Sequence, residues 1–133
     1  MFFSPDLELD PALLAFVKCH VTSPARWEVL RTLASQDGAW TSATQLARRT
    51  HRHPHEVTDA LQDLASDGIV EVLSAAAPED VSFRLPPDEP TSVVLHRLID
   101  VATHSLELRA IIAAHLQHVR QQAQAVRTST AAA

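Results

Sequence analysis

The succession of short segments between residues 41 and 85 constrains the fold of this 133-residue chain most strongly. Residues 54–66 begin with a proline and repeat apolar side chains at three- and four-residue spacing, which predicts a helix with one buried face. Gly68 follows as a helix stop. Segments 69–73 and 81–85 are rich in β-branched and aromatic residues and predict two strands joined by a loop. The residues expected to face inward on the helix are Val57, Leu61 and Leu64.

Three further helices are expected before this segment. Prolines at positions 11 and 24 mark first helical residues, which predicts helices over 11–21 and from residue 24 to about residue 36. Thr41 or Ser42 then caps a third, short helix that ends near Thr50. The chain therefore begins with three helices and places the fourth immediately before the hairpin.

Two helices joined by a turn at residues 50–53 and followed by a hairpin form a helix-turn-helix with a wing. Residues 23–34, SPARWEVLRTLA, resemble a helix of ArsR-type winged-helix repressors, and residues 45–47, QLA, resemble their ELA segment. Residues 57–70, VTDALQDLASDGIV, resemble their recognition helix, and MarR-type regulators share much of this pattern. The resemblance covers roughly residues 11–85 and implies a dimeric transcription regulator whose recognition helix enters the major groove of DNA.

The expected fold class is mainly α, a winged helix-turn-helix with a two-stranded wing and a long C-terminal dimerisation helix. The winged-helix domain with its N-terminal helix is predicted at 1–88, the dimerisation helix at 89–127 and a disordered tail at 128–133. The long helical pattern starts at Thr91, contains no Pro or Gly, and is apolar over nearly half its circumference, which favours a homodimer. The predicted dimer interface consists of Leu95, Leu98, Ile99, Ala102, Leu106, Ile112 and Leu116.

Charge is distributed unevenly along the chain. Residues 24–52 carry five arginines and two acids, whereas residues 53–90 carry one arginine and nine acids. Affinity for DNA depends on neutralising phosphates, so the basic turn at 48–53 is predicted to clamp the DNA backbone beside the outward face of helix 54–66. The predicted DNA-binding residues are Arg48, Arg49, Arg52, His53, His55, Thr58, Gln62 and Arg84.

The acids of the same helix favour an alternative. Glu56, Asp59 and Asp63 are expected to point outward, where carboxylates are repelled by phosphate. The arginines of the turn would then form surface ion pairs with Glu56 and Asp59. The alternative function is a winged-helix module that binds another protein and does not bind DNA.

Eight histidines raise the question of a metal site. His104, His115 and His118 fall within about 60° of one another on an ideal helix, and are candidate ligands for a metal; His51, His53 and His55 are a second candidate set. A solvent-exposed polar stripe explains the same spacing, and zinc needs three or four converging ligands. No cofactor is predicted, although a metal or small-molecule effector is left open.

Catalysis is not expected. The only two glycines occupy turn positions, so the chain has no glycine-rich phosphate loop. The single cysteine, Cys19, cannot form an internal disulfide and is expected to be buried, which fits a reducing compartment. Because no apolar run reaches about 18 residues and no leader pattern opens the chain, we expect a cytoplasmic protein without membrane contact. Its expected partners are a second copy of itself and duplex DNA.

Overall fold

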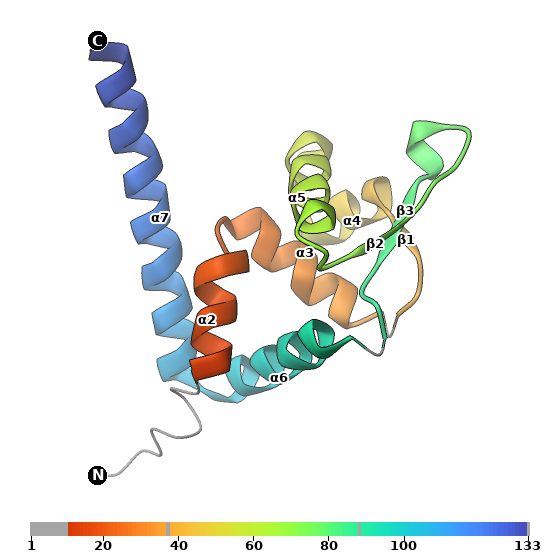
Figure 1. Cartoon of the computed structure of the whole chain (residues 1–133), viewed down its shortest axis with the longest axis horizontal. Coiled ribbons are helices and arrows are strands. Elements are labelled where there is room, and N and C mark those ends of the chain that lie inside the picture. Colours follow the sequence, from red (N-terminus) through yellow and green to blue (C-terminus); the bar gives the residue numbers. More distant parts are fainter. Residues whose placement is uncertain (1–10, 37, 88, 133) are drawn as a thin grey trace.

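The computed structural model describes residues 11–36, 38–87 and 89–132 of the chain. The helices are α2 (Pro11–His20), α3 (Pro24–Ala34), α4 (Ala43–Thr50), α5 (Pro54–Ser66), α6 (Pro90–His104) and α7 (Leu106–Ala132). The strands are β1 (Thr41–Ser42), β2 (Glu71–Leu73) and β3 (Ser82–Arg84), with a 3-10 turn, η1 (Pro78–Asp80), between the last two. Helices α2 and α7 lie at one end of the molecule and the β2–β3 hairpin lies at the other, while α6 runs along the bottom of the view between them (Figure 1).

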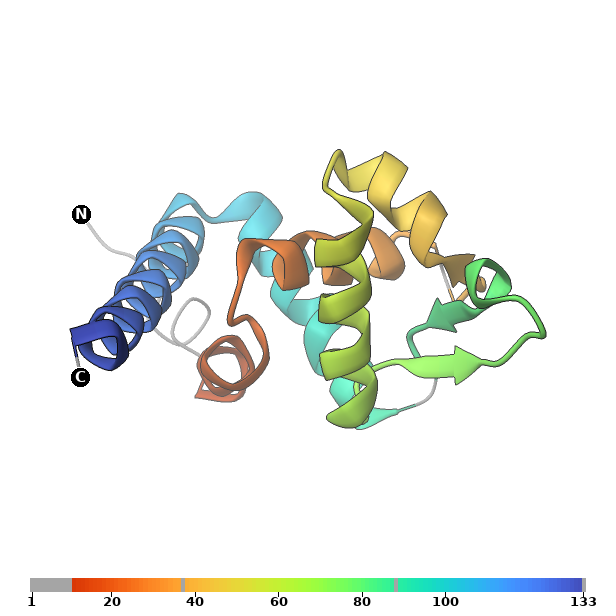
Figure 2. The same cartoon turned by 90° about the horizontal axis from the view of Figure 1, so that it is seen from above.

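The core forms where α5 packs against α3 and α4. Val57, Leu61 and Leu64 are fully buried, which confirms the inward face predicted from their spacing. Leu30 of α3 and Leu46 of α4 are equally buried opposite them. Full burial of such a side chain contributes about 1.5–3 kcal/mol to folding. Helix α5 is thereby fixed between the α2–α7 end and the hairpin, as the view from above shows (Figure 2).

The sheet has three strands in the order β1-β3-β2, whereas the sequence predicted a two-stranded wing. Thr41 of β1 pairs with Phe83 of β3, and Val72 of β2 pairs with the same residue from the other side. The two predicted strands are also shorter than expected, because Ile69 and Val70 are buried in the core but precede β2. The additional strand anchors the wing to the start of α4.

Serine side chains cap the starts of two helices, and Ser42 is one of the two caps that the sequence predicted for α4. The hydroxyl of Ser23 accepts the backbone N–H of Arg26 at 3.1 Å at the start of α3. At the start of α4, Ser42 accepts the N–H of Gln45 at 3.2 Å, and the Gln45 side chain accepts the N–H of Ser42 at 3.2 Å. This reciprocal capping box satisfies two backbone donors that the helix leaves unpaired.

Helices α4 and α5 end in the same backbone motif with different residues. After α4, the N–H of Arg52 donates to the carbonyl of Ala47 at 3.2 Å, and His51 has the left-handed conformation with φ 56°. After α5, the N–H of Ile69 donates to the carbonyl of Leu64 at 2.9 Å, and Gly68 has φ 77°. Both bonds span six residues and satisfy a terminal carbonyl. Gly68 confirms the predicted helix stop.

The long C-terminal helix predicted from Thr91 is divided into α6 and α7 at Ser105. Ser105 leaves the helical conformation, with φ −122° and ψ 111°, and its hydroxyl accepts the N–H of Leu108 at 3.1 Å. A serine that caps the following turn can end a helix without Pro or Gly. Helix α7 then continues to Ala132, through residues where a disordered tail was expected. No helix in the described part of the chain is long and apolar enough to cross a membrane.

The packing of α6 and α7 buries most of the residues predicted for the dimer interface within the chain itself. Four of its residues are buried within the chain itself, because α6 packs against α2 and α3 and α7 packs against α2 and α6. These residues are Leu95, Leu98, Ala102 and Ile112. Ile99 and Leu116 are partly buried against the same core, and only Leu106, which is 77 % exposed, remains open. Most apolar residues of this stripe therefore belong to the chain's own hydrophobic core.

Candidate nucleic-acid interface

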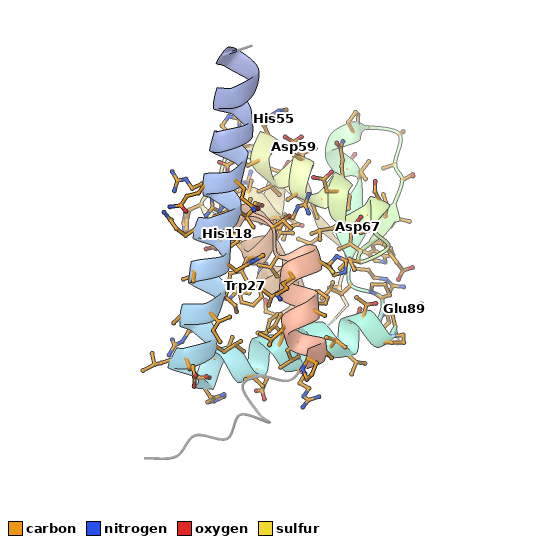
Figure 3. The ribbon with its side chains drawn as sticks, turned by 60° about the vertical axis from the view of Figure 1, so that its left-hand side comes forward. Trp27, His55, Asp59, Asp67, Glu89 and His118 are labelled. Atoms are coloured by element: carbon orange, nitrogen blue, oxygen red, sulfur yellow. The ribbon has the colours of Figure 1, made fainter. Side chains whose placement is uncertain are left out.

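The outer face of α5 is polar and accessible. His55 and Gln62 are exposed and Thr58 is half-buried, which is where the predicted contact residues were expected. His55 and Asp59 lie near the outer end of α5, with Asp67 at its other end (Figure 3). Hydroxyl and amide groups of this kind can donate to and accept from base edges in the major groove.

Two of the outward carboxylates on α5 have a partner one turn away. The Arg52 guanidinium lies 3.3 Å from a carboxylate oxygen of Glu56, and Nε2 of His55 lies 3.6 Å from one of Asp59. The Arg52–Glu56 pair is the surface ion pair that the sequence offered as an alternative use of this arginine. Nε of Arg52 is also buried without a hydrogen-bond partner among the described residues. Arg52 is therefore held against the turn rather than extended into solvent.

The third carboxylate is paired with an arginine of another helix. Arg26, in the first turn of α3, donates a hydrogen bond to Asp63 of α5. These residues are 37 positions apart, and no local sequence signal connects them. Two of the three carboxylates that argued against DNA binding thus lie within 4 Å of an arginine, which reduces the negative field of this face, and the third, Asp59, lies beside the imidazole of His55.

Arg48 and Arg49 remain as the open charges of this region. Both are exposed in the last turn of α4, and neither is within 4 Å of a carboxylate in the described parts of the chain. Cations in this position are stabilised by the negative end of the helix dipole. We refer to residues 48–55, with these arginines and the first turn of α5, as the α4–α5 corner.

His53 has a structural role at the start of α5. Its Nδ1 accepts the backbone N–H of His55 at 3.0 Å, and the two imidazole rings are 6.5 Å apart at 82°. Because the backbone N–H can only donate, Nδ1 is the unprotonated nitrogen in this arrangement. The predicted DNA-binding residue His53 is thus first an N-cap of the helix that carries His55.

The wing differs from the corner in how its arginine is used. Nε of Arg84 donates to a carboxylate oxygen of Glu71 at 3.1 Å, and its guanidinium lies 4.5 Å from the ring centroid of Trp40. The sequence proposed Arg84 as a DNA contact, and it identified neither Trp40 nor Glu71 as its partner. Residues 71–83 contain no lysine or arginine. The only basic side chain of the hairpin is therefore engaged at its base.

The candidate metal ligands do not come together. His104 lies in the last turn of α6, with Nδ1 3.0 Å from the carbonyl of Asp100, whereas His115 and His118 lie beyond the break at Ser105 on α7. Within the described residues of one copy, no three His, Cys, Asp or Glu side chains form a group that could hold a metal ion. Cys19 was expected to be buried and is exposed, because the inward positions of α2 are taken by other residues.

A cavity of about 240 Å³ lies where α3, α6 and α7 meet. It is lined by Trp27, Arg31, Ile99, Ala102, Thr103 and Arg109. An indole and two guanidinium groups around one small volume are suited to a planar organic anion. The sequence did not identify this cavity, because its residues come from three helices.

Comparison with known proteins supports the fold. Residues 21–83 match the family model HVO_A0114, and no curated protein matches the chain. The YusO protein of Bacillus subtilis is 17% identical, with a TM-score of 0.52 over 94% of this chain and 85% of that one. MarR of Staphylococcus aureus, solved with salicylate and kanamycin, is 18% identical, with a TM-score of 0.54 over 95% of this chain and 80% of that one. The chain thus has the winged-helix fold of these two proteins.

Proposed function

We propose that this chain is a DNA-binding transcription regulator that acts as a homodimer and represses transcription. The observation that carries the proposal is the charge of the α4–α5 corner. Arg48 and Arg49 are exposed and unpaired within the described structure, while the carboxylates of neighbouring α5 are held by other side chains. A polyanion that approaches this corner meets free guanidinium groups before it meets free carboxylates.

In the proposed complex α5 enters the major groove and the corner contacts the backbone. Thr58 and Gln62 hydrogen-bond to base edges, for which a glutamine side chain suits adenine. Arg48 and Arg49 contact phosphates, which sets the position of α5 without reading sequence. The similarity to the structures of YusO and of a MarR protein supports the fold on which this proposal rests.

Helix α7 supports the homodimer. It has 27 residues, and its C-terminal half extends beyond α2 (Figure 1). A helical segment without a packing partner is only marginally stable in water. A second copy of the chain is therefore the expected packing partner of this half of α7. Two copies would present two α5 helices to DNA, as helix-turn-helix dimers do at half-sites about 34 Å apart. Sedimentation at micromolar concentration checks this, and a purely monomeric chain would contradict it.

The function itself is tested by binding to a pool of random duplexes at increasing salt concentration. We expect binding at 50 mM salt that weakens steeply by 200 mM, with a log–log slope of roughly −0.9 for each phosphate contacted. Sequencing the retained duplexes gives the operator. A folded, dimeric protein that binds no duplex at 50 mM salt would refute the proposal.

A second candidate function, docking of another protein on the wing, is favoured by one observation. Strand β2 is at the edge of the sheet, and its neighbouring residues Val72 and Leu73 are 46 % and 50 % exposed. An edge strand with apolar side chains can pair with an extended peptide. The variant Val72→Glu separates the two functions, since it would abolish peptide docking and leave DNA binding near wild type.

The cavity beside Trp27 supports an effector site within the proposed regulator. Its two arginines, Arg31 and Arg109, would pair with the carboxylate of an aromatic acid. Salicylate, which the S. aureus MarR structure contains, is the first probe. We expect salicylate to change the fluorescence of Trp27, and Arg109→Ala to weaken that response about tenfold. An equal response in both proteins would exclude the cavity.

A further inference from the structure

His51 is the only non-glycine residue with positive φ in the described parts of the chain. For a residue with a Cβ atom the left-handed conformation is unfavourable, and glycine adopts it without that penalty. Gly68 at the equivalent position after α5 shows the unstrained solution within the same molecule. The end of α4 therefore carries a local strain that one substitution would remove.

No side-chain interaction in the described part of the chain compensates this strain. The His51 side chain is exposed, and in the described structure it makes no hydrogen bond, ion pair or ring contact. Its backbone N–H donates to the carbonyl of Ala47, but glycine would make the same bond. The imidazole therefore makes no contact in the described structure that would explain a histidine at this strained position.

The residues next to His51 indicate a ligand-binding role for its imidazole. Arg48 and Arg49 precede it in the last turn of α4, and His53 begins the cap of α5 two residues later. Backbone strain that persists without internal compensation is typical of binding sites. We propose that His51 donates a hydrogen bond to a DNA backbone phosphate at the α4–α5 corner, and that its strained conformation aims the ring outward. This inference rests on the proposed DNA binding.

The proposal predicts opposite effects on stability and affinity. His51→Gly relieves the strain and removes the donor, so it should raise Tm by roughly 2–6 °C and weaken operator binding about three- to tenfold. His51→Ala removes the donor but keeps the Cβ atom, so it should weaken binding equally without the rise in Tm. His51→Asn keeps a donor and tolerates the left-handed conformation, so it should stay within about threefold of wild type.

Gly68→Ala provides the matched control. A Cβ atom at Gly68 meets no atom within 4 Å, so any loss of stability there comes from the backbone conformation alone. We expect a lower Tm, by an amount that mirrors the gain in His51→Gly, and unchanged operator binding. This variant calibrates the strain independently of DNA.

The experiment measures Tm and operator affinity of the full chain at one salt concentration. If His51→Ala binds like wild type while Arg48→Glu with Arg49→Glu does not bind, the phosphate contact of His51 is refuted and the proposed function stands. If His51→Gly gains no Tm, the strain that motivates the proposal is refuted. If wild type binds no duplex, the inference falls together with the proposed function.

Discussion

The α4–α5 corner and the wing both carry arginines, and the two regions use them differently. In the corner, Arg48 and Arg49 point into solvent without a partner among the described residues. In the wing, Arg84 is held by Glu71 and by the face of Trp40. A count of basic residues therefore does not locate a phosphate site, because the charge of a paired arginine is already compensated by its partner. The proposed DNA contact is therefore one-sided.

The largest expected effect comes from reversing the charges of the corner. Arg48→Glu combined with Arg49→Glu should weaken operator binding about 100-fold at 100 mM salt and make the salt slope shallower by about 2. Fluorescence anisotropy with labelled duplex measures both quantities. Lys18→Glu, at an exposed position on α2, is the control for charge reversal and should stay within twofold. An unchanged double variant would remove the corner from the DNA site.

A smaller and different effect is expected at the base of the wing. Arg84→Ala removes an ion pair and a cation–π contact, which together contribute about 1 kcal/mol, so Tm should fall by roughly 3–6 °C. Operator affinity should stay within twofold, because the arginine is already engaged. Thermal melting and the same anisotropy titration check the two outcomes. A tenfold loss of affinity at unchanged Tm would show that the wing contacts DNA after all.

The smallest effect concerns the pair of Arg26 and Asp63. Arg26→Ala leaves a carboxylate unpaired on the outer side of α5 and should weaken DNA binding about threefold. Asp63→Asn should instead strengthen it about twofold, and the double variant should lie close to wild type. This double-mutant cycle isolates the pair. A double variant that binds as weakly as Arg26→Ala would mean that Arg26 contacts DNA directly and does not act through Asp63.

Local signals in the sequence were sufficient to predict the helix-turn-helix. The bounds of α5 follow from a proline at one end and Gly68 at the other, and both act on the backbone of their own segment. Strand β1 has only two residues, which is too short for any periodicity, so it was missed. The break at Ser105 was missed as well, because a serine is compatible with a helix interior until its hydroxyl caps the next turn.

The candidate site was predicted less completely than the fold. The outward residues of α5 follow from helical spacing, as the exposure of His55 and Gln62 bears out. Which arginines are free does not follow from spacing, since Arg84 meets Trp40 only when β1 and β3 are paired. For a related reason, the sequence did not show that most of the predicted interface residues are covered within the chain itself. A stripe of apolar residues looks the same whether the chain's own core or a second copy covers it.

The bend between α6 and α7 also determines how far a small rotation at Ser105 moves the end of α7. Helix α7 is about 40 Å long, and it is joined to α6 through one residue, Ser105, whose hydroxyl holds its first turn. A rotation of about 10° at this joint moves the far end of α7 by about 7 Å. If the two copies of the proposed homodimer associate through α7, the angle at this joint sets the distance between their two α5 helices. The span of the operator would then be adjusted at a residue remote from the DNA.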